Sequence, residues 1–159
     1  LEYGEERWAK RISEFILAGR EDKKIESTFE LVEIIKKAIP AGARQGGGHP
    51  ARQTFQAIRI ETNKELTVLA SVLKQAVNIL KPHGRLAVIS FHSLEDRIVK
   101  DYFKYETLNC ICHPSQPICT CDKIERLKII SKKPIVASSE EISYNNRSRS
   151  AKLRVAEKI

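Results

Sequence analysis

Four cysteines lie within the segment 110–121 as two C-x-C pairs. Thiolates are soft ligands, and four of them satisfy the tetrahedral coordination of a zinc ion. Because C-x-C is less usual than C-x-x-C, a local disulfide and unliganded thiols are alternatives to a metal site. Four thiolates leave no open position on the ion, so a bound metal would be structural and would clip the loop together. The residues concerned are Cys110, Cys112, Cys119 and Cys121, with His113 as a spare ligand and with Pro114 and Pro117 between the pairs.

A second group of reactive side chains, Ser90-Phe91-His92-Ser93, directly follows a short apolar run. It offers two hydroxyls and an imidazole, the side chain that titrates nearest to neutral pH. In open α/β sheets, ligands bind beyond the carboxyl ends of strands, so this loop is the best site candidate. The alternative is structural: Ser93 caps the next helix, with Asp96 completing a capping box, and Phe91 packs into the core.

The chain is basic, with 28 Lys and Arg against 20 Asp and Glu and a formal net charge of +8. Lys and Arg neutralise phosphates, so this charge favours a nucleic acid as partner. The alternative is a solvated basic surface without a bound polyanion. An anionic membrane surface is a weaker rival, because no helix combines a long apolar face with a wholly basic one. No apolar run is long enough to span a bilayer, and the charged start does not resemble a signal peptide, so we expect a cytoplasmic protein.

The first part of the chain is helical by its pattern. Apolar residues recur at helical spacing over residues 5–18. Ser27 and Glu30 form a capping box ahead of a second helix, which Pro40 closes. A short helix should follow Pro50, which stands in the position favoured at a helix start.

The second part alternates helices with strands. Thr62 and Glu65 form a capping box that predicts the start of a long helix ending near Lys81. Leu86–Ile89 is a continuous apolar run bounded by turn signals, which predicts a central parallel strand covered on both faces. The next helix should begin at Ser93, and the final strand pieces are expected at 127–130, 134–136 and 153–155.

This order of elements is typical of an α/β domain. We place a boundary near Asn63, with a helical unit over residues 1–62 and part of an α/β sheet over residues 63–159.

Four ordered motifs resemble one protein family. They are GRLAVISFHSLEDRIVK at 84–100, YGEER at 3–7, HP at 49–50 with TFQA at 54–57, and RSRS at 147–150 with LR at 153–154. Together they resemble the bacterial ribosomal RNA small-subunit methyltransferase H family, the cytosine-N4 methyltransferases of MraW type. Two positions depart from the family: Arg52-Gln53 stands where it usually has Thr-Arg, and Asn146 stands where it usually has Pro.

The resemblance implies that the chain is a carboxyl-terminal half. Residues 1–62 would be part of a helical RNA-recognition insertion, and residues 63–159 the last part of a Rossmann-like class I methyltransferase sheet. The start at Leu1 and the absence of Met agree with a piece of a longer protein. No G-x-G-x-x-G occurs, and Gly46-Gly47-Gly48 follows a helix and fits no phosphate-binding fingerprint. We therefore expect the residues that bind S-adenosylmethionine to lie outside this chain.

The resemblance also implies a reaction and its site. The exocyclic amine of a cytidine in the decoding region of small-subunit ribosomal RNA would be methylated. Ser90, His92 and Ser93 would line the acceptor pocket, with His92 the best candidate to receive a proton. A base that is methylated must leave its stack, so cations should hold the RNA backbone around it. The cations expected there are Arg52, Arg59, Arg147, Arg149, Lys152 and Arg154.

The expected partner is the small ribosomal subunit, and an unpaired strand edge could also pair with a second copy to give a homodimer. The main rival is a basic, non-catalytic RNA-binding or ribosome-associated module with a zinc clip. A structural interaction domain is a third reading and would show no salt-dependent affinity for RNA. The segment 90–100 favours the enzyme, because a binding module has no need of such a loop at the carboxyl end of a strand.

Overall fold

The computed structural model describes residues 3, 5–45, 48–114, 116 and 118–159. Gly4 of the first motif, Gly46 and Gly47 of the triple glycine, and Pro117 of the cysteine loop lie outside the described residues. The chain divides into two compact units, Leu1–Glu65 and Leu66–Ile159, and this division lies close to Asn63. Among the described residues, no helix is both long enough and apolar enough to cross a membrane.

The first unit is helical in its described part. Its elements are α1 (Ala9–Asp22), α2 (Thr28–Ala38), the 3-10 helix η1 (Ala41–Gln45) and α3 (Arg52–Asn63). Ile12 of α1 and Ile35 of α2, which are 3% and 0% exposed, belong to one buried core cluster. The expected capping box is confirmed: the Ser27 hydroxyl accepts from the Glu30 N–H at 3.2 Å, and the Glu30 carboxylate accepts from the Ser27 N–H at 3.3 Å.

Two helix starts differ from the expectation. Helix α1 begins at Ala9 rather than near residue 5, because Glu5 has a φ of 48°, a left-handed conformation that an α-helix does not contain. The capping box expected from Thr62 and Glu65 is wrong. Lys64 has a φ of 54° and ends α3, so Thr62 lies inside α3 and Glu65 is already the first residue of α4 (Glu65–Ile79).

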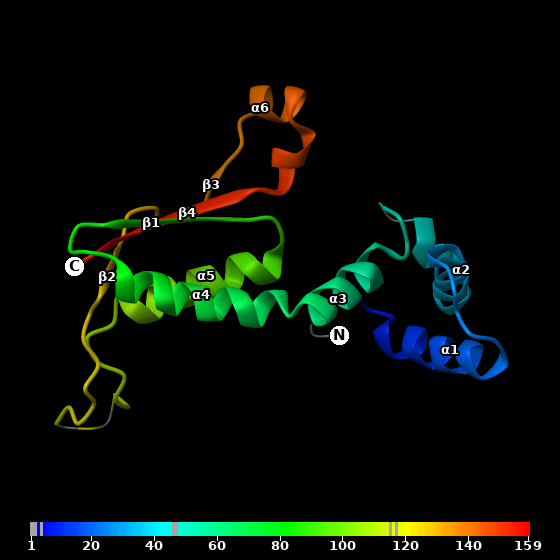
Figure 1. Ribbon diagram of the computed structural model, residues 1–159, viewed down its shortest axis with the longest axis horizontal. Helices are drawn as coiled ribbons and strands as arrows, with labels where there is room; N and C mark the ends of the chain where they lie inside the picture. Colours follow the sequence, from blue (N-terminus) through cyan, green and yellow to red (C-terminus); the bar gives the residue numbers. More distant parts are fainter. Residues whose placement is uncertain (1–2, 4, 46–47, 115, 117) are drawn as a thin grey trace. The chain divides into compact units, whose positions relative to one another are not determined.

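The second unit is an α/β layer, as the sequence predicts. After α4 come β1 (Arg85–Ser90), α5 (Ser93–Glu106), β2 (Leu127–Ile129), β3 (Ile135–Val136), α6 (Ser139–Tyr144), the 3-10 helix η2 (Asn146–Ser150) and β4 (Lys152–Lys158). Strand β4 pairs antiparallel with β1, β2 and β3. Helices α4 and α5 lie together along one face of this small sheet (Figure 1). The core consists of Leu73, Val77, Val99, Phe103, Leu127 and Ala156.

Strand β1 is not the central parallel strand, covered on both faces, that its apolar run predicts. Among the described residues it pairs with β4 alone, in antiparallel register along its whole length. Leu86 and Val88 pack against the core, whereas Ile89 is 58% exposed. An apolar run indicates a strand, but it does not show whether one face or both faces are covered within the same chain.

The cap of α5 lies one residue earlier than expected. His92 is the N-cap, and its Nδ1 accepts from the Glu95 N–H at 3.4 Å. The Glu95 carboxylate accepts in return from the N–H groups of Phe91 and His92, at 2.8 and 3.3 Å. The capping box expected from Ser93 and Asp96 is therefore wrong, because Ser93 is already helical and Asp96 pairs with a strand.

A buried ion pair joins α5 to β4. Nε and Nη2 of Arg154 donate to the two carboxylate oxygens of Asp96 at 2.6 and 3.1 Å, and each residue is 8% exposed. Lys152 adds a third charge, with its Nζ 3.5 Å from the same carboxylate. The guanidinium of Arg154 holds the pKa of Asp96 below its usual value. Arg154 is thus paired within the fold, and its expected role as an RNA contact stays a prediction.

Replacing Asp96 by Asn in the intact gene product should lower the free energy of unfolding by about 2 to 3 kcal/mol at pH 7, because a buried guanidinium loses its partner. A carboxyl with a lowered pKa contributes stability that is present above its unfolded pKa and is lost as the pH falls through its folded pKa. The difference between the variant and the unaltered protein should therefore shrink below about pH 4. Urea denaturation at several pH values measures both effects.

Asp101→Asn is the matched control for this substitution. Asp101 lies on the same helix, but its carboxylate is 60% exposed and 3.5 Å from Lys100. Its replacement should change the free energy of unfolding by less than about 0.5 kcal/mol. Equal effects of the two substitutions would show that the Asp96–Arg154 pair gives no stability beyond that of a surface pair.

Candidate functional site

The loop of residues 90–93 joins the carboxyl end of β1 to the start of α5, and its two serines lie in different environments. Ser90 is 3% exposed, and its hydroxyl donates to the carbonyl oxygen of Lys152 at 3.4 Å. This bond holds the end of β1 against β4. Ser93 is exposed on the first turn of α5. Of the two serines, Ser93 is the exposed one.

His92 is held against Glu95. The imidazole is 11% exposed, and its Nε2 lies 3.2 Å from Oε1 of Glu95. No hydrogen bond of good geometry reaches this nitrogen within the described part of the chain. An imidazole beside a carboxylate is an arrangement that general acid–base catalysis uses. The same side chain therefore serves as a helix cap and as the candidate proton acceptor.

Phe91 is a feature that the sequence reasoning assigned differently. The alternative reading placed its ring in the core, but Phe91 is 54% exposed. An exposed aromatic ring beside a polar loop offers a flat surface on which a nucleobase can stack. The position of Phe91 in the sequence could have indicated this exposure. Phe91 lies between Ser90 and His92, where the strand has ended and side chains no longer alternate between the two faces of a sheet.

The tail motif presents two arginines on η2. Arg147 and Arg149 are exposed, and neither forms an ion pair with the described residues. Ser148 between them is 6% exposed, and its hydroxyl donates to the carbonyl oxygen of Asn145 at 2.8 Å. The turn starts at Asn146, so it forms without the proline that the family usually has there. Ser148 is buried, whereas both arginines are exposed on η2, which contacts α6 and directly precedes β4. Figure 1 shows this segment leading from α6 into β4.

The other expected cations differ in availability. Lys152 is half-buried beside the carboxylate of the α5–β4 ion pair, and Arg154 belongs to that pair. In the first unit, Arg59 donates twice to the carboxylate of Glu65, at 2.9 and 3.1 Å. Arg52 is exposed on α3 and has no ion pair among the residues described. Arg52, Arg147 and Arg149 are therefore the best placed of the six to meet phosphates.

The residues of this chain do not fit S-adenosylmethionine. A nucleotide-type site in a Rossmann-like sheet needs a glycine-rich turn after a strand and a carboxylate for the ribose. The loop after β1 contains no glycine. Of its neighbouring carboxylates, Asp96 is paired with Arg154 and Glu95 accepts backbone N–H groups. These two acidic groups are already used.

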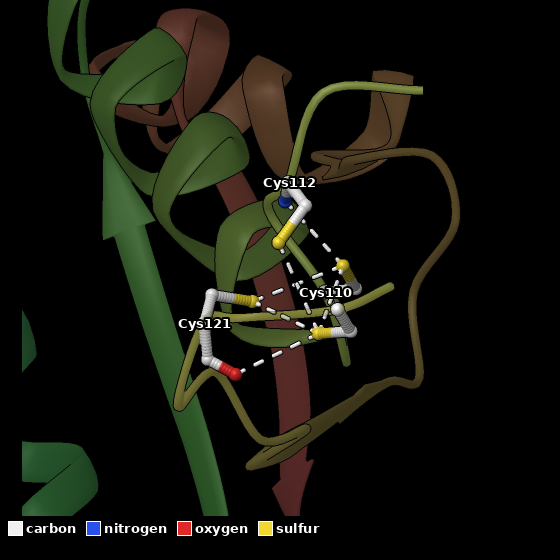
Figure 2. Close-up of side chains that lie close together, drawn as sticks. Cys110, Cys112 and Cys121 are labelled. Atoms are coloured by element: carbon white, nitrogen blue, oxygen red, sulfur yellow. Dashed lines mark hydrogen bonds between the residues drawn. The ribbon is translucent and has the colours of Figure 1, made fainter. Parts of the chain in front are cut away.

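The four cysteines converge in the loop between α5 and β2. Figure 2 shows Cys110, Cys112 and Cys121 with their sulfur atoms turned toward one another. The Sγ–Sγ distances are 3.5 Å for 110 and 119, 3.6 Å for 119 and 121, 3.8 Å for 110 and 121, and 3.9 Å for 112 and 119. All four sulfurs lie within 4.8 Å of one another. A disulfide bond is about 2.0 Å long, and these cysteines are free thiols, so the local-disulfide alternative is wrong.

Backbone N–H groups of the same loop point at three of these sulfurs. The N–H of Ile111 donates to Cys121 at 3.4 Å, that of Thr120 to Cys112 at 3.5 Å, and that of Cys112 to Cys110 at 3.4 Å. Because such bonds favour the charged form, the Ile111 N–H lowers the pKa of Cys121 to about 6, and the Thr120 N–H lowers the pKa of Cys112. At Cys119 the backbone contact with Cys121 is outweighed by hydrogen bonds with the neighbouring thiols, which instead raise the pKa of Cys119 to about 12. The backbone thus favours the thiolate, the form of cysteine that binds metals, at Cys112 and Cys121.

Comparison with known proteins gives one consistent result over the whole chain. The family described as the MraW methylase family matches residues 1–159. The chain is 58% identical over 158 residues to a protein of Heliobacterium mobile and to one of Clostridioides difficile (strain 630), and 55% identical over 160 residues to one of Finegoldia magna. Each of the three is named ribosomal RNA small subunit methyltransferase H.

The matches cover 99% of this chain for the first two relatives and 100% for the third, but 51% of each relative. The chain therefore spans about half the length of the curated relatives it matches. Identity at this level over every element described above leaves one conclusion: the chain belongs to the MraW methylase family.

Proposed function

We propose that this chain is the acceptor and RNA side of an enzyme that methylates the exocyclic amine, N4, of a cytidine in the decoding region of small-subunit ribosomal RNA. The observation that carries the proposal is the match of the whole chain to the MraW methylase family, with relatives named as small-subunit ribosomal RNA methyltransferases. The small ribosomal subunit is the proposed substrate, which places the reaction in the cytoplasm.

This reaction makes two demands on the acceptor side. The cytosine amine is a weak nucleophile, because its lone pair is delocalised into the ring, so it must be held in line with the bond that breaks. The nitrogen must also lose a proton, so a base has to lie nearby. S-adenosylmethionine supplies the electrophilic methyl group, and the protein around the base orients the amine and takes the proton.

We assign both tasks to the loop of residues 90–93. His92, with Nε2 3.2 Å from Oε1 of Glu95, is the proposed proton acceptor. Ser93 is exposed at the start of α5, where its hydroxyl can accept from an N–H of the amine. Ser90 contributes indirectly, because its bond to the Lys152 carbonyl oxygen fixes the end of β1. The exposed ring of Phe91 offers a stacking surface for a base that has left its helix.

The open edge of strand β1 is evidence for a larger sheet in the intact protein. Its edge opposite β4 has no partner strand among the described residues, and Ile89 is 58% exposed on the face turned away from the core. An open edge with an apolar face tends to pair, and a parallel strand with its helix would cover both. We propose that residues outside this chain complete a Rossmann-like sheet at this edge. A second copy of the chain, in a homodimer, is the alternative partner.

The RNA side of the proposal rests on exposed cations. Arg147 and Arg149 lie on η2 in the second unit, and Arg52 lies on α3 in the first. A flipped base leaves a distorted backbone whose phosphates need neutralising charges. The first unit is the proposed part of a helical RNA-recognition insertion, and η2 is the proposed contact of the second unit.

A non-catalytic RNA-binding or ribosome-associated module is the alternative function. The exposed arginines and the cysteine cluster would serve such a module equally well. His92 and Ser93 at the carboxyl end of β1 favour the enzyme, because binding alone does not require an imidazole and a hydroxyl at that position.

Transfer of labelled methyl from S-adenosylmethionine to small ribosomal subunits that lack the modification tests the proposal. The intact gene product should label N4 of a cytidine, as nucleoside analysis of the digested RNA would show. The 159-residue chain alone should transfer no label and should bind no S-adenosylmethionine in calorimetry. Absence of label with the intact gene product, across subunits at several stages of assembly, would favour the binding module. Label in a different nucleoside would overturn the proposed target.

Two substitutions separate the structural role of His92 from its proposed chemistry. His92→Asn keeps an acceptor at the N-cap, so the free energy of unfolding should change by less than about 0.5 kcal/mol, whereas His92→Ala should lower it by about 1 kcal/mol. Both remove the imidazole, so both should lower kcat by about 100-fold. Thermal unfolding and single-turnover methylation measure the two effects. Full activity of His92→Asn would show that His92 is a helix cap alone.

Replacing Arg147 and Arg149 together by Gln should weaken RNA binding and reduce the slope of log K against log salt by about 1 to 2, because each phosphate contact contributes about 0.7 to 0.9. Fluorescence anisotropy with unmodified small-subunit RNA at several salt concentrations measures this slope. Replacing Lys74 and Lys81 together by Gln is the matched control, since both are exposed on or just after α4. An equal loss in the control would indicate that net charge, rather than the η2 turn, holds the RNA.

A further inference from the structure

We propose that Cys110, Cys112, Cys119 and Cys121 bind a single zinc ion, and that this ion fixes the loop between α5 and β2. The site is separate from methyl transfer, because four protein ligands leave zinc no position for a substrate. The proposal rests on sulfur geometry and on the lack of an apolar core in this segment.

The sulfur positions match one tetrahedral ion. Zinc binds thiolate sulfur at about 2.3 Å, so the sulfurs of a regular tetrahedron lie about 3.8 Å apart. The four closest distances in the cluster run from 3.5 to 3.9 Å, and the remaining pairs stay within 4.8 Å. Thiols are weak hydrogen-bond donors and weak acceptors, so they have little reason of their own to converge in this way.

The ligand set selects the kind of metal. A tetrahedral set of four thiolates is typical of zinc or of iron–sulfur chemistry. In a multi-iron cluster the four thiolates are divided among two or four irons, which separates the sulfurs more widely overall than a single ion does. Zinc is the proposed occupant, because closed sets of four cysteine ligands are among its common structural sites.

The loop lacks an apolar core that could order it. Among its described residues, 107–126 contain no helix and no strand. Its large apolar side chains are exposed, with Ile111 at 52%, Ile118 at 73% and Ile124 at 66%. Neither buried cluster of the described structure includes a residue of this loop. Long loops without secondary structure are uncommon in compact domains, and a metal can supply the folding free energy that burial does not.

An ion pair already closes the base of the loop. Nε and Nη2 of Arg126 donate to the Glu106 carboxylate, both at 2.7 Å, and the Arg126 N–H donates to the Glu106 carbonyl oxygen at 2.8 Å. Glu106 is 3% exposed, and Lys123 Nζ lies 3.6 Å from it. This clamp holds the two ends of the loop, and the zinc ion would hold the segments that carry the two C-x-C pairs. The loop would thus be fixed at two separate points.

Metal analysis of the intact gene product tests the proposal without any measurement of methylation. Protein purified under reducing conditions with zinc in the medium should contain one zinc per chain, and X-ray absorption should show four sulfur ligands at about 2.3 Å. Replacing Cys112 and Cys119 together by Ser should abolish zinc binding. His113→Gln, in the same loop, is the matched control and should keep one zinc per chain.

A second measurement covers the case in which the double variant does not fold. A strong chelator, added to the unaltered protein, should open residues 107–126 to limited proteolysis while the far-ultraviolet circular dichroism of the helices persists, and added zinc should restore protection. Protein that binds no zinc when reconstituted under reducing conditions would overturn the proposal. So would iron as the bound metal, zinc retained after both cysteines are replaced, or zinc lost from His113→Gln.

Discussion

Two buried charges, Asp96 at the first turn of α5 and Arg154 on β4, determine how the helix is set against the sheet. A buried guanidinium and a buried carboxylate each lose hydration, and that cost is offset only when both hydrogen bonds between them are well formed. The bonds of 2.6 and 3.1 Å therefore restrict the position of the first turn as well as its distance from the strand. The cap residue His92 and the loop before it take their position from this turn.

The cap has a consequence for the proposed proton transfer. Nδ1 of His92 accepts the Glu95 N–H, so the neutral imidazole carries its proton on Nε2, the atom that lies 3.2 Å from Oε1 of Glu95. To take a proton from the substrate, the ring must free a lone pair. The lone pair of the neutral ring is on Nδ1, so Nδ1 would have to leave the cap, and the Glu95 carboxylate beside Nε2 would balance the imidazolium that forms. Proton uptake by His92 would thus be coupled to the first turn of α5.

Local sequence signals were sufficient where neighbours in the chain decide the outcome. Short spacing rules predict the capping box of Ser27 and Glu30, the α/β order of the second unit and the convergence of the cysteines. The predictions are wrong where a residue that is distant in the sequence determines the local structure. The spacing predicts Asp96 as a capping residue, yet it pairs with Arg154, which lies 58 positions away in the sequence. The apolar run of β1 identified a strand, but its one-sided burial depends on which segments cover it.

The second unit relies on polar links because its apolar core is small and one face of β1 is open. The Asp96–Arg154 pair fixes α5 to β4, and the Glu106–Arg126 pair closes the cysteine loop. Both carboxyls have a lowered pKa, chiefly because of the arginine that each one faces. Each pair therefore gives stability that is complete near neutral pH and is lost as the pH falls through the lowered pKa. The stability that a zinc–thiolate centre would give is also lost as the pH falls, since acid protonates its ligands. The links that order the second unit would thus weaken together on acidification, and the apolar contacts among α4, α5 and the sheet would remain as the acid-resistant part of the unit.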